Sequence, residues 1–318
     1  MVWDMSRYLV TGGAGFIGSH LVETLAARGH RVRVVDNLTT GRRVNLHHVP
    51  GVEFLFGDVS DLHVARLAAD DVDIVLHQAA MASVPKSVSD PISSHHANVT
   101  ATLNVLVAAR EAGVRRVVFA GSSAAYGDTG RLPTDEETPV NPLSPYALQK
   151  LVGEGYCRLF ADLYGLETVT TRYFNVFGPR QDPSSPYSGV ISLFTTAMLQ
   201  GRAPIVYGDG EQTRDFTYVV NVVEAVLKAA EADVPRGAII NVAAGARVSL
   251  NELIGSINAS LGTDLRPVYK DARAGDVKHS QADISKARSL LGYEPAIGFD
   301  EGITRTIAWC RAQAPVSV

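Results

Sequence analysis

Residues 7–36 are arranged in the order that most constrains the fold: a strand, a glycine-rich turn, a helix and a second strand. The apolar run at 7–11 leads straight into glycines at positions 12, 13, 15 and 18. Apolar residues at helical spacing follow over 17–28, and a second strand is expected at 31–36. This order within about thirty residues predicts a βαβ unit, the start of a doubly wound parallel sheet.

The glycines and the acid that follows them match a dinucleotide-binding turn. Gly12 permits a tight turn, Gly15 lets backbone N–H groups approach a pyrophosphate, and Gly18 lets the helix pack closely. Asp36 ends the second strand, where a carboxylate accepts from ribose hydroxyls and repels a 2′-phosphate. The segment therefore predicts NAD rather than NADP, with Arg42 and Arg43 interpreted as solvated loop charges.

Strand and helix patterns alternate as far as residue 174. The fold class predicted is α/β, a Rossmann-type doubly wound parallel sheet with a smaller mixed α/β C-terminal domain. We expect an NAD-binding domain over 1–174, to which the chain returns near 215–243, and a substrate domain over 175–318 with loops at 178–189, 207–214 and 271–280. Strands are expected at 7–11, 31–36, 52–56, 72–77, 115–121 and 167–172, and helices near 17–28, 61–69, 94–112 and 145–164.

Composition excludes several classes of protein. A net charge of −4 gives no reason to expect nucleic acid or an anionic membrane as a partner. No apolar run has the length of a membrane span, and the N-terminus does not resemble a signal peptide. Two cysteines suit a reducing cytoplasm. The histidine pairs 47–48 and 95–96 have poor ligand spacing, so no metal is expected, and His77 is interpreted as a packed histidine near the cofactor.

A second motif, at 144–150, carries candidate catalytic groups. Tyr146 and Lys150 lie four residues apart and share one helix face. Ser144 can cap this helix and Pro145 fits its first position. The helix dipole and the lysine charge are expected to lower the pKa of Tyr146 towards neutrality, which would make it a general base for an alcohol proton. Ser122, at the end of the strand 115–121, could orient or relay that proton.

Together these motifs resemble the extended short-chain dehydrogenase/reductase family. The segments are TGGAGFIGSH, SSAAYG, SPYALQK, RYFNVFGPRQDP and GDGEQTRDFTYV, in order over most of the chain. Within that family they resemble nucleotide-sugar 4-epimerases. The phrases HQAAMASVPKSVSDP and GDVKHSQADISKA are closest to the branch that acts on UDP-N-acetylglucosamine and UDP-N-acetylgalactosamine.

The resemblance implies roles for individual residues. Catalysis would fall to Ser122, Tyr146 and Lys150. The NAD site would be lined by Gly12, Gly15, Phe16, Ile17, Gly18, Asp36, Asn37, Asp58, Val59, Ala79, Ala80, Asn98, Tyr146, Lys150 and Tyr173. The UDP-sugar would contact Ser83, Ser122, Ser123, Asn175, Gln181, Tyr207, Arg214, Arg273, Asp276 and Ser280.

The implied reaction inverts C4 of a UDP-hexose through a 4-keto sugar, with NAD tightly bound and regenerated in each turnover. Ser280 falls where related epimerases carry a gatekeeper, and its small size predicts that acetamido sugars fit along with UDP-glucose and UDP-galactose. Ala82 departs from that branch, where glycine is common. Relatives form homodimers through a four-helix bundle, here 94–112 and 145–164, with Leu103, Leu106, Val107, Leu151, Cys157 and Leu159 as candidate contacts.

Three alternatives compete with this interpretation. A dehydratase would carry an Asp-Glu pair where this chain has Ser123 and Ala124. A UDP-glucuronic acid epimerase or decarboxylase would need a cation near 181–190, and the run 181–187 offers an acid and no base. A non-catalytic NAD-binding regulatory protein would keep the fold, but it has no use for Ser122, Tyr146 and Lys150 together.

Overall fold

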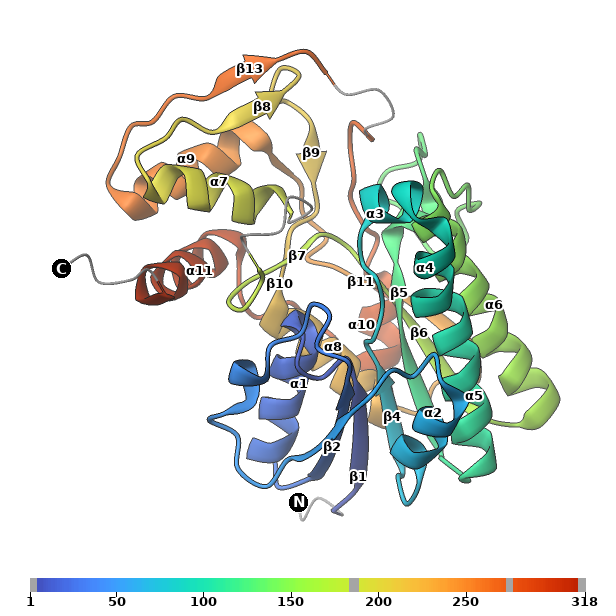
Figure 1. Ribbon diagram of the computed structural model, residues 1–318. Coiled ribbons are helices and arrows are strands. Elements are labelled where there is room, and N and C mark those ends of the chain that lie inside the picture. The colour runs from blue at the N-terminus through green and yellow to red at the C-terminus, as the bar shows by residue number, and fades with distance from the viewer. Residues whose placement is uncertain (1–4, 183–188, 273–276, 314–318) are drawn as a thin grey trace.

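Seven parallel strands form the central sheet, in the order β11-β6-β5-β4-β1-β2-β3 (Figure 1). The computed structural model describes residues 5–182, 189–272 and 277–313. The strand order reverses beside β1, which pairs with β2 on one side and β4 on the other. Ligands of such sheets bind at this reversal, beyond the carboxyl ends of the strands. The strands are β1 (Arg7–Thr11), β2 (Arg31–Asp36), β3 (Glu53–Phe56), β4 (Ile74–His77), β5 (Arg116–Ser122), β6 (Glu167–Tyr173) and β11 (Ala238–Val242).

Helices cover both faces of the sheet, which explains why its strands are apolar on both sides. Val117, Val118 and Phe119 of β5 are each at most 1% exposed. One apolar core lies between the sheet and α1 (Phe16–Ala27), α8 (Val219–Glu231) and α10 (Ser285–Leu291). The other lies under α2 (Leu62–Ala69), α5 (Ala101–Glu111) and α6 (Pro145–Tyr164). The fold class predicted from the sequence is confirmed.

The helix expected at 94–112 is present, but it begins earlier, at Pro91, and its α-helical pattern is interrupted by a π-helical turn. It is divided into α4 (Pro91–His95), a π-helical turn (His96–Thr100) and α5. Asn98 lies buried in the π turn, where its amide accepts from Met81 N at 2.8 Å and donates to Gln149 Oε1 at 2.8 Å. A π turn often marks a functional region, and here its polar residue is satisfied by partners outside the helix. Apolar periodicity carries no information about such partners.

The remaining elements form a lobe above the sheet (Figure 1). Its apolar core joins α7 (Val190–Leu199), α9 (Leu250–Leu261) and α11 (Phe299–Gln313). Short strand pairs connect the lobe: β7 (Val176–Phe177) with β10 (Thr217–Tyr218), β8 (Ile205–Tyr207) with β13 (Val268–Lys270), and β9 (Thr213–Arg214) with β12 (Val248–Ser249). Between these pairs the chain returns to the sheet through α8 and β11. The domain boundary at residue 174 stays a prediction.

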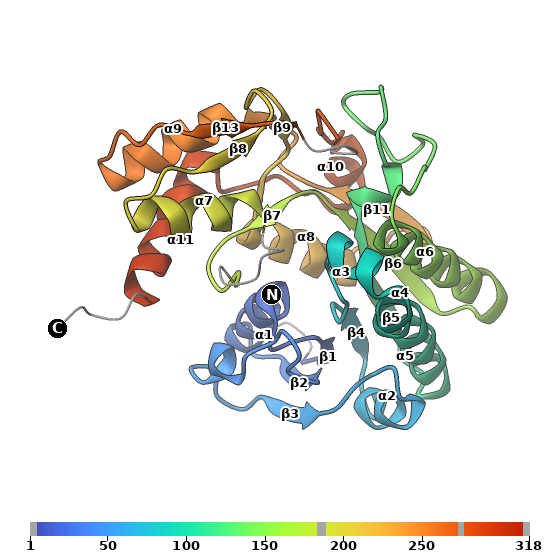
Figure 2. The same ribbon diagram turned by 45° about the horizontal axis from the view of Figure 1, so that its top comes forward.

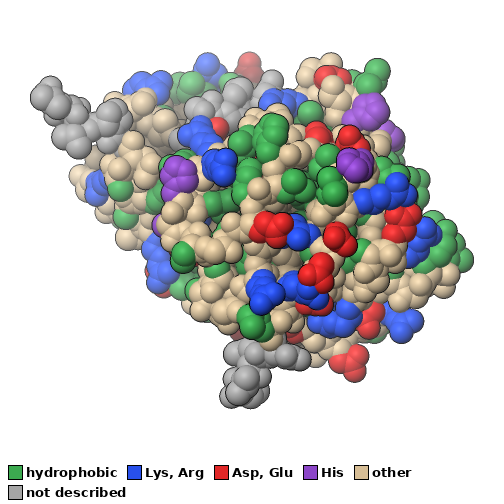
Figure 3. All heavy atoms as spheres, turned by 60° about the horizontal axis from the view of Figure 1, so that its bottom comes forward, with side chains coloured by type: hydrophobic (Ala, Val, Ile, Leu, Met, Phe, Trp, Pro, Cys, Tyr) green, Lys and Arg blue, Asp and Glu red, His purple; other side chains and the backbone are tan. Residues whose placement is uncertain are grey.

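Membrane spans, metal clusters and surface charge were each considered for the described residues. No helix in the described part of the chain is long and apolar enough to cross a membrane. The described residues also contain no cluster of three His, Cys, Asp or Glu side chains that could hold a metal ion. On the face shown in Figure 3, basic and acidic side chains are interspersed rather than separated. Mixed charge of this kind creates little net field over that face.

Candidate active site

A cavity of about 1120 Å³ lies beyond the carboxyl ends of the strands, between the sheet and the lobe. It is larger than the cavities that typically hold one small molecule, so it has room for a dinucleotide and a second ligand. Most of the residues predicted for the site line it together. These are Gly12, Gly15, Phe16, Ile17, Gly18, Asp36, Asn37, Asp58, Val59, Ala79, Ala80, Ser122, Ser123, Tyr146, Lys150, Tyr173, Asn175, Gln181, Arg214 and Ser280.

Three predicted residues lie away from the cavity wall. Asn98 is occupied by Met81 and Gln149 behind the wall. Ser83 caps α3 (Val84–Ser89) by accepting from Lys86 N, although its neighbours on both sides do line the cavity. Tyr207 belongs to β8, and its carbonyl accepts from Gln212 at 2.6 Å. Direct ligand contact by these three is therefore not supported. Arg273 and Asp276 lie outside the described residues.

The glycine turn is as tight as the motif predicts. Gly12 has φ +66°, and a Cβ on it would lie 2.8 Å from Ala79 N. A Cβ on Gly18 would lie 2.2 Å from Gly12 O, so the first turn of α1 packs directly on the glycine turn. A Cβ on Gly13 would meet Val34 at 2.7 Å, a requirement that the sequence reasoning missed. Side chains at these positions would prevent the close approach.

The carboxylate of Asp36 organises the loop beside the turn. It accepts from Ala14 N at 3.0 Å and from Leu38 N at 2.8 Å. Burial raises the pKa of Asp36, and the two backbone hydrogen bonds oppose that shift. An ionised carboxylate has about four acceptor positions, so capacity is left for ribose hydroxyls. Nearby, Asn37 donates to Asp58 Oδ2 at 2.8 Å, and both side chains line the cavity.

Tyr146 lies in the first turn of α6, where the sequence places it. Ser144 is the N-cap, accepting from Ala147 N at 3.2 Å, and Pro145 is the first helical residue. Tyr146 N donates to Ser87 Oγ of α3 at 3.1 Å, which fixes the start of α6 against that helix. The phenol is thereby directed to the cavity that also contains Ser122.

The sequence predicted a lowered pKa for Tyr146, and that prediction is wrong for the effect of the protein groups alone. Burial raises the pKa of Tyr146, and only the hydrogen bond with Ser122 opposes the rise. The Lys150 ammonium is directed elsewhere: it donates to Ala120 O at 2.8 Å and lies 5.0 Å from the centre of the Phe119 ring. The sequence gives the shared helix face but not the direction of the lysine side chain. Further positive charge in the cavity is needed before the phenol can be a base at neutral pH.

Two buried ionisable groups, Lys150 and His77, lie beside the cavity near Tyr146. Burial lowers the pKa of Lys150 to about 8, while the Glu154 carboxylate opposes the shift. His77 is 1% exposed, and its two ring nitrogens lie 2.7 Å from Thr11 Oγ1 and 3.0 Å from Thr102 Oγ1. Burial, followed by the Lys150 charge, lowers the pKa of His77 to about 3. His77 is therefore a neutral, packed histidine beside the cavity.

The substrate side of the cavity is held by a parallel bridge between residues 213 and 279. Thr213 N donates to Lys278 O at 3.0 Å, and Ser280 N donates to Thr213 O at 3.1 Å. Asp215 fixes the same region because its carboxylate accepts from the backbone N–H groups of Ala244, Gly245 and Ala282. Arg214 and Ser280 are thus presented to the cavity by one rigid arrangement.

Gln78 and Lys86 are among the lining residues that the sequence reasoning missed. Gln78 accepts from Tyr173 OH at 3.1 Å, while its buried Nε2 has no partner among the described residues. Lys86 of α3 also lines the cavity and brings a cation to its wall. Gln78 directly follows a strand and could have been suspected on that ground. Lys86 could not, because its position depends on how α3 folds back.

The residues present fit a bound NAD. The first turn of α1 has no side-chain cap and carries no acid, so its backbone N–H groups are open to a pyrophosphate. Asp36 retains acceptor capacity for a ribose, and the unpartnered Nε2 of Gln78 can donate to a ligand. These polar groups have hydrogen-bonding capacity that a bound NAD would satisfy.

Comparisons with known proteins agree with the geometry. Residues 8–243 match the model of the NAD dependent epimerase/dehydratase family. A putative UDP-glucose 4-epimerase of Methanocaldococcus jannaschii is 43% identical over 305 residues, which cover 95% of this chain and 98% of that protein.

Solved structures give the same result. A UDP-N-acetylglucosamine 4-epimerase from Methanobrevibacter ruminantium, in complex with UDP-N-acetylmuramic acid, is 40% identical with a TM-score of 0.93, covering 98% of this chain and 99% of that one. A UDP-glucose 4-epimerase of Thermus thermophilus in complex with NAD is 38% identical with a TM-score of 0.88, covering 96% and 99%. The chain belongs to the NAD dependent epimerase/dehydratase family.

Proposed function

We propose that this protein is an NAD-dependent 4-epimerase of UDP-hexoses, an isomerase. The observation that carries the proposal is that Tyr146, Ser122 and Lys150 line the same cavity as the glycine turn and Asp36. An alcohol base and a dinucleotide site in one cavity suit reversible oxidation of a sugar carbinol. The similarity to UDP-glucose and UDP-N-acetylglucosamine 4-epimerases supports the UDP-hexose class.

The division of roles follows from where the residues lie. The glycine turn and Asp36 would hold the NAD pyrophosphate and adenosine ribose, while Lys150 and Tyr173 line the part of the cavity beside Tyr146. When bound, NAD would supply reversible hydride transfer at the sugar C4. Because the cofactor is restored in each turnover, the protein benefits from holding it tightly.

Tyr146 would accept the proton of the sugar 4-hydroxyl and give it back after the ring has turned. Ser122 lines the same cavity, and its hydroxyl acts to lower the pKa of Tyr146, so it can pass or orient that proton. The protein groups alone raise the pKa of the phenol, so the positive charge of an oxidised nicotinamide would be what lowers it. The base would then be active only while an oxidised cofactor is present.

Rotation of the sugar requires a firm grip on the nucleotide and a loose one on the ring. Arg214, positioned by Thr213 and Asp215, offers a guanidinium for the diphosphate. The walls near Tyr146 carry the short side chains of Ser122, Ser123 and Ala124. Small walls leave space in which a 4-keto ring can turn.

We further propose that acetamido sugars are accepted. Ser280 lines the cavity, held by its backbone hydrogen bond to Thr213 O at 3.1 Å, and its small side chain leaves room for a 2-N-acetyl group. The substrates are then UDP-N-acetylglucosamine and UDP-N-acetylgalactosamine together with UDP-glucose and UDP-galactose.

A second candidate function is action on UDP-glucuronic acid, as an epimerase or decarboxylase. The observation that favours it is Lys86, because its side chain lines the cavity and could meet a sugar carboxylate. The described residues Gln181 and Asp182 offer no cation on the other side. Lys86 therefore decides whether an acidic sugar belongs among the substrates.

The test is to incubate purified protein with each of the four UDP-hexoses and with UDP-glucuronic acid, and to resolve the products by chromatography. C4 epimers of the neutral sugars are expected, and Tyr146→Phe should lose them. Conversion of UDP-glucuronic acid alone would establish the second candidate. Silence with all five, despite bound NAD, would favour a non-catalytic NAD-binding regulatory protein.

We also propose a cytoplasmic homodimer formed through a four-helix bundle. The helices α5 and α6 lie side by side on one flank, as Figure 2 shows. Ile92, Leu159 and Leu163 on this flank are 71%, 48% and 68% exposed. Leu106 and Cys157 are buried in the monomer core, so those two expected contacts are wrong. Light scattering on wild type and Leu163→Glu tests the dimer, which the charge should weaken.

Cytoplasmic location is proposed because Cys157 and Cys310 are both free thiols, which suits a reducing compartment. The location can be tested by fractionating the source cells and following the epimerase activity.

A further inference from the structure

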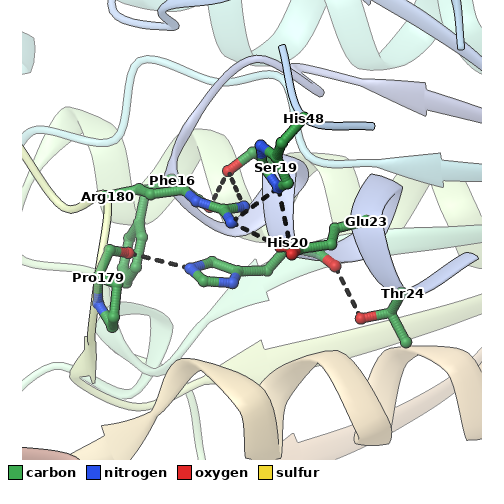
Figure 4. A network of polar contacts seen from close by, with 8 residues as sticks. All are labelled: Phe16, Ser19, His20, Glu23, Thr24, His48, Pro179 and Arg180. Atoms are coloured by element: carbon green, nitrogen blue, oxygen red, sulfur yellow. Dashed lines mark hydrogen bonds and ion pairs between the residues drawn. The ribbon is translucent and has the colours of Figure 1, made fainter. Parts of the chain in front are cut away.

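A cluster of polar side chains joins helix α1 to the loop that follows β7 (Figure 4). Arg180 donates to Glu23 Oε2 at 2.5 Å and to Ser19 Oγ at 3.4 Å. His48 lies 3.1 Å from the other oxygen of Glu23 and 3.3 Å from the Arg180 guanidinium. One guanidinium therefore connects the lobe side of the structure to α1 and to the loop that carries His48.

His20 adds a neutral contact to the same cluster. Its Nε2 lies 3.0 Å from the carbonyl oxygen of Pro179, so that nitrogen must carry the hydrogen (Figure 4). Burial is the main reason that the pKa of His20 is lowered to about 4. His20 also contacts the ring of Phe16, which lines the main cavity. The contact thus reaches the wall of the dinucleotide site.

A second link crosses the rim of the cavity two residues further on. Asp182 forms an ion pair with Arg42 at 3.1 Å. Both line a smaller cavity that shares Thr39, Thr40 and Lys86 with the main one. The ion pair therefore lies beside the loop that follows Asp36.

The elements joined in this way are those that hold the dinucleotide. Arg42 N donates to Ala14 O of the glycine turn at 2.9 Å, and Asp36 accepts from Ala14 N. Glu23 lies two turns into α1, whose N-terminus faces the cavity. Movement of the 179–182 segment would release both the helix and the loop.

The backbone of Arg180 is in a strained conformation. Arg180 has φ +68°, a left-handed conformation that glycine adopts freely and arginine rarely does. Its side chain is only 14% exposed and is held by Glu23 and Ser19. A strained residue with a fixed side chain points to a functional role more than an ordinary surface ion pair would.

We propose that these contacts form a clasp that retains NAD, with Arg180 as its main positioning residue. The clasp consists of Pro179, Arg180 and Asp182 on one side and Ser19, His20, Glu23, Arg42 and His48 on the other. It acts on the cofactor through α1 and through the loop after Asp36, and it touches no reacting atom. The proposal rests on NAD occupying the main cavity and is independent of which sugar is bound.

The test measures how fast NAD leaves. Wild type and variants are loaded with NAD, freed of excess cofactor, and mixed with alcohol dehydrogenase and ethanol, which convert released NAD to absorbing NADH. Arg180→Met should release NAD about tenfold faster, because it removes hydrogen bonds between charged groups. Asp182→Asn and Arg42→Met should each give about two- to fivefold faster release, since their ion pair is more exposed.

Arg180→Gly separates backbone from side chain. Glycine relieves the left-handed strain, so the melting temperature should be higher than that of Arg180→Met, while NAD release should still accelerate about tenfold. If both release and stability match wild type, the side chain does not retain the cofactor and the proposal is overturned. Arg180→Lys keeps the positive charge but lacks the paired N–H groups of a guanidinium. Its rate of NAD release should lie between those of wild type and Arg180→Met.

Two controls make the result specific. Glu301→Gln removes an exposed ion pair with Arg305 on α11 and should leave release at the wild-type rate. Exchange of the rim pair, Arg42→Asp with Asp182→Arg, should restore slow release relative to either single exchange. Equal acceleration in Glu301→Gln, or no recovery in the exchanged pair, would contradict a clasp. Because no sugar is present, failure here leaves the epimerase proposal intact, and failure of epimerase activity leaves the clasp intact.

Discussion

The ammonium of Lys150 donates a hydrogen bond of 2.8 Å to the backbone carbonyl of Ala120. Ala120 lies two residues before Ser122 in β5, so the lysine on α6 is attached to the strand that carries the hydroxyl proposed to relay the proton. Lys150 thereby aligns α6, which carries Tyr146, with β5.

Lys150→Met should therefore reduce kcat by about a hundredfold or more, the lower range for loss of acid–base assistance. It should also lower the free energy of unfolding by about 1–3 kcal/mol, because the carbonyl of Ala120 loses its partner in a buried place. Initial rates with UDP-galactose and urea unfolding measure the two effects. A variant with wild-type kcat would remove Lys150 from the mechanism.

Ser122→Ala tests the hydrogen bond that opposes the raised pKa of Tyr146. Without that bond the pKa of the phenol rises further, since burial then acts unopposed. The base must be deprotonated to act, so the acidic limb of the kcat profile should move to higher pH. The pH dependence of kcat in both proteins checks this. An unmoved limb with lower kcat would show that Ser122 orients the sugar without tuning the base.

Ser280→Tyr should abolish turnover of UDP-N-acetylglucosamine and spare that of UDP-glucose. The large ring would fill space beside the sugar that the 2-N-acetyl group requires, whereas a hydroxyl at that position needs no such space. The rates of both substrates, measured in competition, give the ratio of their kcat/KM values. If both activities survive unchanged, residue 280 does not control access.

The buried His77 predicts loss of stability in mild acid. The unfolded chain binds a proton at the ordinary histidine pKa of 6.5, whereas the folded pKa is about 3. The folded state therefore binds fewer protons between these values, and stability falls as pH decreases below 6.5. Geometry agrees, because His77 Nδ1 must accept from Thr11 while Nε2 donates to Thr102.

For one such group the loss between pH 6.5 and pH 5 is about 2 kcal/mol. His77→Gln should reduce the acid sensitivity of the wild type by that amount in urea unfolding at the two pH values. His20, with its pKa lowered to about 4, contributes separately and stays in the variant. Equal acid sensitivity in both proteins would show that His77 is not the group responsible.

Gly18→Ala should destabilise the glycine turn and weaken NAD binding. The added methyl would lie 2.2 Å from Gly12 O, a backbone atom that cannot move without the turn. A cost of about 1–3 kcal/mol is typical of such overpacking. Gly255→Ala in α9 is a matched control, because a Cβ there meets nothing within 4 Å. The control should gain about 0.5–1 kcal/mol from helix propensity. Thermal unfolding and NAD content measure both.

The sequence predicted the sheet well because parallel strands covered on both faces need continuous apolar runs, as in Val117, Val118 and Phe119. It predicted the start of α6 because Ser144 and Pro145 act locally. It failed where partners come from distant segments. The π turn at Asn98 depends on Met81 and Gln149, and neither pattern nor propensity reveals such contacts.

The candidate site shows the same limit. Gly12, Asp36 and Tyr146 could be predicted because their motifs are local. The direction of the Lys150 side chain could not, since it is set by Ala120 on another element. Likewise Lys86 reaches the cavity only because α3 folds back over it. Long side chains near a site need the tertiary structure before their role can be assigned.

The place of β11 at the edge of the sheet has a consequence for biosynthesis. Six strands have been synthesised once Tyr173 is added, but the seventh, Ala238–Val242, comes only after several elements of the lobe. Until then β6 is an open edge, exposed to pairing with other nascent chains. The stretch between β6 and β11 must therefore be translated before the nucleotide-binding half can close.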